Sequence, residues 1–194
     1  MYDYNKIIVI GDIHGDYKMF LKCLTLAKLI DSEGNWKGGN TYVVQVGDTL
    51  DGKRPSTKID KNFLDESGEV EILKYIIYLD SQAKNKKGRV ISLIGNHELY
   101  PYYLQNDKEF IKDFVKTKDI EMFKKSYDID RIKFLQPGNQ GGSLIGRTRP
   151  LLLQLGQFLF VHGSITDKLI KNNLVNGKVD IEEINRKTSL WLQG

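Results

Sequence analysis

Three apolar runs, each followed by a glycine and then by polar residues of the kind that bind metals, constrain this chain most. The runs and their motifs are residues 7–10 before Gly-Asp-Ile-His, residues 43–46 before Gly-Asp-Thr-Leu-Asp, and residues 90–94 before Gly-Asn-His-Glu. Short apolar runs bounded by glycine are typical of buried strands. Because the carboxyl ends of parallel strands meet at one edge of a sheet, we predict that the three motifs form one site there.

Two amphipathic segments separate these runs and predict the connections between the strands. Residues 17–30 carry apolar side chains at helical spacing behind Asp16, a residue suited to cap a helix, and residues 69–83 repeat that spacing. The order strand, helix, strand, helix, strand predicts crossover connections and a parallel sheet. Residues 52–68 are polar and without periodicity, and we expect them to form a long loop beside the site.

The second half of the chain predicts a different mixture of elements. Aromatic and charged residues fill residues 99–125, which predicts two or three helices that cap the site; an aromatic base-stacking surface is the alternative to helix packing. The glycine-rich residues 136–146 predict a loop. The remaining expected elements are a hairpin of residues 151–155 and 158–161, and helices over residues 166–174 and 181–192.

Length and composition predict one globular domain. The chain has 194 residues, of which 40% are hydrophobic and 28% charged, and no linker-like stretch divides it. The net charge of +4 is modest and scattered, so nucleic acid is not an expected partner. The single cysteine, Cys23, excludes an internal disulfide and fits a reducing compartment. No secretory signal or membrane span is visible, and we expect a cytoplasmic protein that does not bind membranes.

All three histidines of the chain follow a predicted strand and lie close to a glycine. His14 and His162 directly precede a glycine, and His97 lies two residues after one. Imidazole nitrogens and carboxylate oxygens bind divalent metals, and a pair of such ions suits displacement at phosphorus because the ions polarise the phosphoryl oxygens and generate a hydroxide. We therefore predict a site for two ions. The predicted ligands are Asp12 and His14 for the first ion, Asp48 as the bridge, and Asn96 and His162 for the second.

His97 adjoins Asn96 and is predicted to have a different task. Two neighbouring side chains do not easily reach the same ion, so we expect His97 to be the general acid that protonates the leaving oxygen. A carboxylate beside an imidazole orients the ring, and Asp51 is the predicted partner.

In type, order and approximate spacing, these motifs resemble those of the calcineurin-like metallophosphatase superfamily. Its pattern is Gly-Asp-x-His, Gly-Asp-x-x-Asp, Gly-Asn-His-Glu and, after a later strand, a His-Gly pair that is His162-Gly163 here. The resemblance covers about residues 6–165 and is greatest to phosphoprotein phosphatases of the Shewanella-like, bacterial-type branch. It implies a four-layer α/β/β/α sandwich and attack by a hydroxide bound to two divalent ions. Manganese is expected first, and iron, zinc or magnesium are the alternatives.

The resemblance also implies one domain over residues 1–194, with a helical cap insertion at about residues 99–140. The family usually has an arginine directly after the last Asp of the second motif to grip the substrate phosphate, but this chain has Gly52 there. Arg54 is a predicted substitute, and Arg147 and Arg149 are its rivals, because guanidinium groups bind phosphate well. Asn96 is expected to contact the phosphate as well.

The family supplies one more histidine to the second ion from a later strand, and this chain has none after His162. We therefore expect either an incomplete C-terminal end, without the last strands of the sandwich, or a second ion with too few ligands. Missing strands would leave an exposed sheet edge through which the chain could form oligomers.

The function predicted from these residues is a metal-dependent phosphoesterase that hydrolyses phosphomonoesters. A protein phosphatase acting on phosphoserine, phosphothreonine or phosphotyrosine is the first choice, so the expected partner is a phosphorylated protein or a small phosphoester. Two alternatives keep the same residues: a diadenosine-polyphosphate hydrolase or phosphodiesterase, and a domain that binds metal or phosphate without catalysis.

Overall fold

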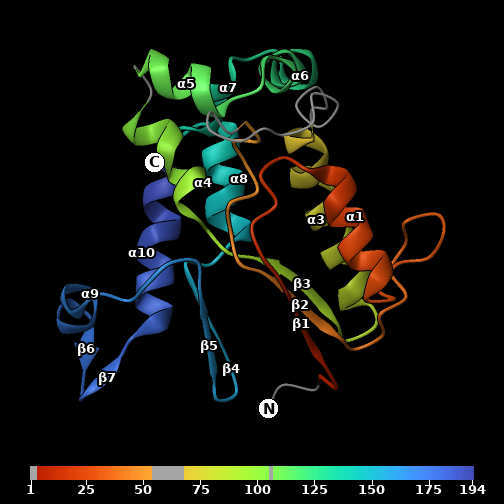
Figure 1. The fold of residues 1–194 in the computed structure, drawn as a ribbon. Helices are drawn as coiled ribbons and strands as arrows, with labels where there is room; N and C mark the ends of the chain where they lie inside the picture. The colour runs from red at the N-terminus through yellow and green to blue at the C-terminus, as the bar shows by residue number, and fades with distance from the viewer. Residues whose placement is uncertain (1–3, 54–67, 105–106) are drawn as a thin grey trace.

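The computed structural model describes residues 4–53, 68–104 and 107–194. Strands β1 (Ile7–Ile10), β2 (Tyr42–Gln45) and β3 (Arg89–Ser92) form a parallel sheet in the order β1-β2-β3 (Figure 1). The register pairs Ile10 with Gln45 and Gln45 with Ser92, so the three strands end at the same level. The predicted parallel sheet is confirmed, and it brings the three motifs to one edge.

Helices α1 (Tyr17–Leu26) and α3 (Glu69–Lys84) connect these strands and cover one face of the sheet. Phe20 of α1 and Leu79 of α3 are fully buried in one cluster with Val43 of the central strand. Asp16 caps α1 as predicted, because its carboxylate accepts a hydrogen bond from the Met19 N–H at 2.8 Å. The helix ends earlier than predicted, and Lys28 has a left-handed backbone with φ of 60°.

An antiparallel hairpin, β4 (Leu152–Leu155) and β5 (Phe158–Val161), covers the opposite face and confirms the prediction for this segment. Val44 of β2, Ile91 of β3 and Leu155 of the hairpin belong to one buried cluster between the two sheets. Helix α10 (Ile181–Gln193) packs on β4, where Asn185 accepts hydrogen bonds from the N–H groups of Leu151 and Leu152 at 2.9 and 3.0 Å.

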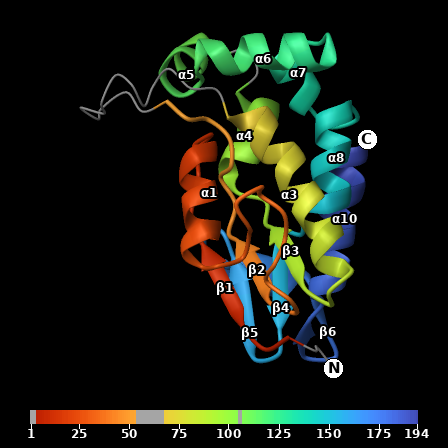
Figure 2. The same cartoon turned by 90° about the vertical axis from the view of Figure 1, so that its right-hand side faces the viewer.

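Four further helices form a cap beyond the carboxyl ends of the parallel strands (Figures 1 and 2). They are α4 (Asn96–Tyr103), α5 (Lys108–Phe114), α6 (Thr117–Tyr127) and α7 (Arg131–Leu135). The helices predicted for residues 99–125 are therefore confirmed. Phe123 and Phe134 of the cap share one buried cluster with Leu73 of α3 and Leu192 of α10, so the cap is held to the body by a continuous core.

The loop predicted for residues 136–146 is wrong, because most of this segment belongs to helix α8 (Gln140–Thr148). Its glycines allow close packing: a Cβ on Gly141 would lie 2.3 Å from the Phe134 ring, and a Cβ on Gly146 would lie 2.8 Å from Leu192 Cβ. Figure 2 shows α8 and α10 side by side. Glycine was the signal for a loop, but here it removes side-chain volume between helices.

The C-terminal part contains the two predicted helices, α9 (Asp167–Asn172) and α10, and a small hairpin that was not predicted. Strands β6 (Leu174–Val175) and β7 (Lys178–Val179) pair across Asn176 and Gly177, which both have positive φ. An Asn-Gly pair is a strong signal for a two-residue hairpin and could have predicted this element.

Within the described residues, no helix combines the length and the apolar composition needed to cross a membrane. Apolar side chains are exposed on the edge strand β1 and on β5: Val9 is 53% exposed, Phe158 52% and Leu159 43%. Whether the chain forms oligomers through this surface stays a prediction.

The buried cluster under the parallel sheet can be tested at two neighbouring positions. Phe20→Ala removes a fully buried ring, and we expect a loss of about 3–5 kcal/mol in the free energy of unfolding, measured by urea denaturation. Met19 is the matched control because its side chain is 45% exposed on the same helix, so Met19→Ala should change stability by no more than about 0.5 kcal/mol. Equal effects of the two changes would contradict the packing described for α1.

Candidate metal centre

The predicted metal ligands meet at the edge of the sheet where the strands end. Asp12 and His14 follow β1, Asp48 follows β2, Asn96 is the first residue of α4 after β3, and His162 follows β5. Asp48 lies in the middle of this group and is buried. The structure thus brings together residues that are up to 150 positions apart in the chain, as the sequence predicted.

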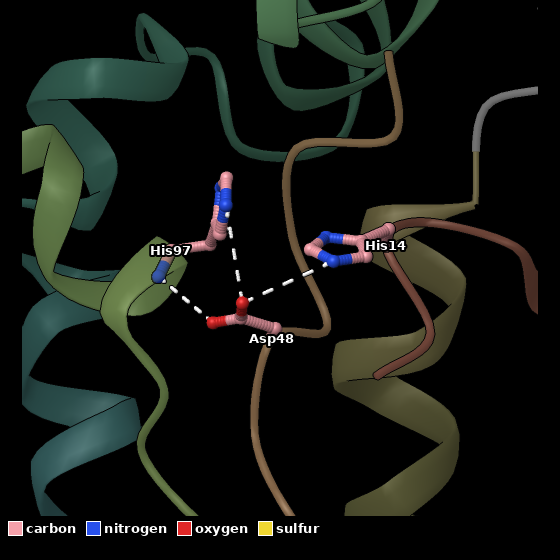
Figure 3. A group of neighbouring side chains, drawn as sticks. All are labelled: His14, Asp48 and His97. Atoms are coloured by element: carbon pink, nitrogen blue, oxygen red, sulfur yellow. Dashed lines mark hydrogen bonds and ion pairs between the residues drawn. The ribbon is translucent and has the colours of Figure 1, made fainter. Parts of the chain in front are cut away.

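One oxygen of Asp48 faces three imidazoles. Asp48 Oδ2 lies 3.9 Å from His14 Nε2, 3.8 Å from His97 Nε2 and 3.3 Å from His162 Nε2. Its other oxygen, Oδ1, accepts a hydrogen bond from the His97 backbone N–H at 2.9 Å. Figure 3 shows His14 and His97 on the two sides of this carboxylate.

The ligand atoms form two groups that share Asp48. One group is His14, Asp48 and His97, and the other is Asp12, Asp48 and His162; within each, the ligand atoms lie within 4.8 Å of one another. His14 Nε2 is also 3.7 Å from Asp12 Oδ2, and His162 Nε2 is 2.8 Å from Asn96 Oδ1, which are the pairs that the sequence predicted. Asp48 can therefore bridge two positions, and Asp12 lies within reach of both.

Two backbone carbonyls fix the orientation of the ligand imidazoles. His14 Nδ1 is 3.0 Å from the Leu50 carbonyl oxygen, and His162 Nδ1 is 2.9 Å from that of Val46. A carbonyl oxygen only accepts, so His14 Nδ1 donates its proton to Leu50 and His14 Nε2 presents a lone pair towards Asp48, whereas His162 Nε2 also faces an acceptor, the Asn96 amide oxygen at 2.8 Å. This arrangement is typical of histidines that bind metals.

The donor set fits a divalent cation. Carboxylate oxygens, an amide oxygen and imidazole nitrogens converge on the buried Asp48, and manganese, iron and zinc accept ligands of these types. Burial raises the pKa of Asp48, although the N–H of His97 and the nearby imidazoles oppose this effect. A cation beside Asp48 would favour its ionised form, so the charge balance of the site is improved by a bound ion.

Tight turns position two candidate ligands and the partner of His97. His14, Asp48 and Asp51 have left-handed backbones, with φ of 48°, 55° and 61°. Gly95 is required because a Cβ there would lie 2.2 Å from Asp48 Oδ1 and 2.4 Å from Asp48 N. Left-handed conformations of such residues cost free energy and persist only where surrounding contacts impose them.

Glu98 supplies those contacts for the loop after β2. Its buried carboxylate accepts hydrogen bonds from the N–H groups of Asp48, Thr49 and Gly95 at 2.9, 2.8 and 2.7 Å. Burial favours the neutral acid, but the Arg149 guanidinium and these donors outweigh burial and lower the pKa of Glu98. The carboxylate therefore stays ionised and ties the β2 loop to the start of α4.

Two of the three arginines predicted to bind phosphate lie away from the candidate ligands. Arg149 is buried, and its Nη1 donates to Glu98 Oε1 at 3.2 Å and to Thr49 Oγ1 at 2.9 Å, which corrects the role predicted for it. Arg147 lies on the surface of α8, where its Nε donates to Gln193 Oε1 at 3.1 Å, away from the Asp48 group. Arg54 lies outside the described residues.

His97 and Asp51 form the predicted pair, since His97 Nδ1 is 2.8 Å from Asp51 Oδ2. Two residues behind this pair were not predicted: Arg131 donates to Asp51 Oδ1 at 2.7 Å, and Glu69 accepts a hydrogen bond from the Asp51 backbone N–H at 2.7 Å. Burial, opposed by Arg131, raises the pKa of Glu69 to about 8, with Asp119 and Asp51 adding to the rise. No local motif marks Arg131, which is 80 positions from its partner.

Comparison with known proteins decides the family. Residues 5–194 match the family model of the calcineurin-like phosphoesterases. The chain belongs to this family. The calcineurin-like phosphoesterase domain predicted from the motifs is thus confirmed over nearly the whole chain.

Relatives of this calcineurin-like phosphoesterase carry a common name. It is 32% identical over 192 residues to Shewanella-like protein phosphatase 1 of Plasmodium berghei, which covers 97% of this chain and 45% of that protein. It is 36% identical over 95 residues to Shewanella-like protein phosphatase 2 of Arabidopsis thaliana, covering 48% of this chain and 21% of that protein. The chain spans less than half the length of these curated relatives.

A solved structure has the same fold. The crystal structure of a cold-active protein-tyrosine phosphatase of a psychrophilic Shewanella species matches 99% of this chain and 51% of its own, with a TM-score of 0.70 and 22% identity. The predicted metallophosphatase fold class is therefore confirmed.

Removal of the negative charge of Asp48 should weaken metal binding strongly. We expect Asp48→Asn to weaken Mn²⁺ binding by about 100-fold or more. Loss of a residue that only supports a ligand costs roughly 10–100-fold in metal affinity, and Asp48 is itself a candidate ligand. Isothermal titration calorimetry of the metal-free chain measures this. Asp128→Asn is the control, because Asp128 is an exposed carboxylate that pairs with Lys124. Similar losses in both variants would contradict a bridging role for Asp48.

The raised pKa of Glu69 predicts a pH dependence of stability. The folded chain holds this proton more tightly than the unfolded chain, so the contribution of Glu69 is complete below about pH 4.5 and is lost as the pH rises to about 8. The difference in melting temperature, wild type minus Glu69→Gln, should therefore fall between about pH 5 and pH 8.5. For Glu183→Gln this difference should stay constant, because Arg186 lowers the pKa of Glu183 to about 2. A constant difference for Glu69→Gln would show that Glu69 is ionised throughout.

Proposed function

We propose that this chain is a metal-dependent phosphomonoesterase. The observation that carries the proposal is the Asp48 carboxylate, which two groups of candidate ligands share. Divalent ions held by Asp12, His14, Asp48, Asn96 and His162, with Mn²⁺ as the first choice, would polarise the phosphoryl oxygens and activate water. The family supports phosphoester chemistry in general, and the two-ion site is our extension of it.

His97 is suited to deliver a proton to the leaving oxygen. Its Nδ1 is held by Asp51 at 2.8 Å, so its Nε2 faces the Asp48 side of the site. A ring fixed in this way presents one nitrogen to a bound phosphoester, and a general acid lowers the barrier most when the leaving oxygen is strongly basic. Asn96 Oδ1 is 2.8 Å from His162 Nε2, so its amide group lies among the candidate ligands, where it could contact a bound phosphate.

The surroundings of His97 favour an aromatic leaving group. Three cap residues border the ring: Tyr100 at 4.7 Å, Phe114 at 6.0 Å and Phe110 at 6.3 Å between ring centroids. All three are partly exposed, so they can contact a bound ligand. Aromatic pairs of this kind are worth about 0.5–1.5 kcal/mol beyond the area they bury.

We therefore propose a protein phosphatase whose preferred substrate is phosphotyrosine, with phosphoserine and phosphothreonine as weaker substrates. The relatives named protein phosphatases and the solved protein-tyrosine phosphatase support this choice. The dinucleotide hydrolase and phosphodiesterase alternatives have no comparable observation in their favour. A panel of phosphopeptides, diadenosine polyphosphates and bis-aryl phosphodiesters separates them.

The activity can be measured with p-nitrophenyl phosphate and Mn²⁺. We expect turnover by the wild type, none above background for Asp48→Asn, and a kcat lower by about 10²–10⁴-fold for His97→Asn with phenyl phosphate as substrate. Asp128→Asn again serves as the control and should retain full activity. Two bound ions per chain without turnover would favour the non-catalytic reading, and turnover that survives Asp48→Asn would overturn the proposed site.

A further inference from the structure

Arg131 connects the cap to the candidate general acid through Asp51. Its Nη2 donates to Asp51 Oδ1 at 2.7 Å, while Asp51 Oδ2 lies 2.8 Å from His97 Nδ1. The two carboxylate oxygens thus have different partners, Arg131 at the start of α7 and His97 on α4. A carboxylate held at both oxygens cannot rotate without breaking a charge-assisted hydrogen bond.

Glu69 completes this arrangement from α3. Arg131 Nε donates to Glu69 Oε2 at 2.7 Å and Nη2 donates to Glu69 Oε1 at 3.0 Å, while Glu69 Oε1 also accepts the Asp51 N–H. Arg131 and Glu69 together therefore hold both the side chain of Asp51 and its left-handed backbone. The Arg131 side chain is 2% exposed, and those of Asp51 and Glu69 are fully buried.

The position of Arg131 depends on the folded cap. Arg131 begins α7, where the Asp130 side chain accepts hydrogen bonds from the N–H groups of Ile132 and Lys133 at 2.9 and 3.2 Å. Its guanidinium carbon lies 5.8 Å from the centre of the Phe123 ring, which belongs to the core between cap and body. The cap thus delivers this guanidinium at a fixed place.

Burial makes the contact costly to disturb. Three carboxyl groups of the described residues, Asp51, Glu69 and Asp119, lie around this one guanidinium, and its removal would leave the ionised groups among them uncompensated in a medium of low polarity. The free energy of this group therefore favours one geometry of Asp51.

We propose that Arg131 is a positioning residue: through Asp51 it holds His97 in the orientation that protonates the leaving oxygen, so that the folded cap sets the activity of the acid. This inference rests on the proposed function. It assigns Arg131 no contact with the substrate or with a metal ligand.

The dependence of rate on the leaving group tests the assignment. Protonation matters most for a basic leaving oxygen, so a misplaced acid slows phenyl phosphate strongly and 2,4-dinitrophenyl phosphate little. For Arg131→Lys we expect kcat with Mn²⁺ to fall by about 100-fold for phenyl phosphate and by no more than about threefold for the dinitrophenyl ester, within the range for general acid catalysis. KM should change little, because Arg131 does not contact the substrate.

Arg149→Lys is the matched control. Arg149 is an equally buried guanidinium that binds a carboxylate, but its partner Glu98 supports the Asp48 loop and not His97. This variant should slow both esters by the same factor. A leaving-group effect of the same size for Arg149→Lys would overturn the assignment.

A double variant distinguishes an effect through His97 from general damage to the fold. If Arg131 acts through His97, adding Arg131→Lys to His97→Asn should cause no further loss with phenyl phosphate. Further loss in the double variant, or a uniform loss for both esters in the single one, would show a structural role only.

Asp51→Asn, which keeps the shape of the side chain, should reproduce the dependence on the leaving group that is expected for Arg131→Lys. If the wild type turns over neither ester, the proposed function is overturned. If the wild type is active but Arg131→Lys lowers kcat by the same factor for both esters, only the role of Arg131 is overturned.

Discussion

The hydrogen bonds of the Glu98 carboxylate hold the site together. This group accepts the N–H groups of Asp48, Thr49 and Gly95, so the loops after β2 and β3 are fixed to each other at their closest approach. Gly95 leaves the necessary room, since any Cβ there would collide with Asp48. Arg149 keeps the carboxylate charged, and the central position of Asp48 among the candidate ligands follows from these contacts.

Two buried arginine–carboxylate pairs thus support two parts of the candidate mechanism. Arg149 and Glu98 support the carboxylate that the metal positions share, and Arg131 with Glu69 supports the partner of the general acid. Buried ion pairs often contribute little net stability, because desolvation offsets the attraction between the charges. Their value here is geometric: each fixes a left-handed loop residue, Asp48 or Asp51, that would relax without it.

Local sequence predicted the parallel sheet, its crossover helices, the hairpin and the convergence of Asp12, His14, Asp48, Asn96 and His162, because each depends on a strand pattern and the residues just behind it. It did not predict α8, whose glycines serve helix packing, or the roles of Arg149 and Arg131. Those two arginines find their partners 51 and 80 positions away, and only the folded chain brings them there.

The two kinds of residue also depend on different parts of the fold. The candidate metal ligands follow strands β1, β2 and β5 or the loop after β3, whereas Asp51 is held by Arg131 from α7 and by Glu69 from α3. Movement of α7, which carries Arg131, would therefore disturb the His97–Asp51 pair before it disturbed the Asp48 group, which residues of α4 hold. The aromatic residues that border His97 lie on α4 and α5, so the surroundings of the leaving group and the placement of the acid are set by the same structural unit. Substitutions in the cap can then change the preferred leaving group while the carboxylate and imidazole ligands stay in place.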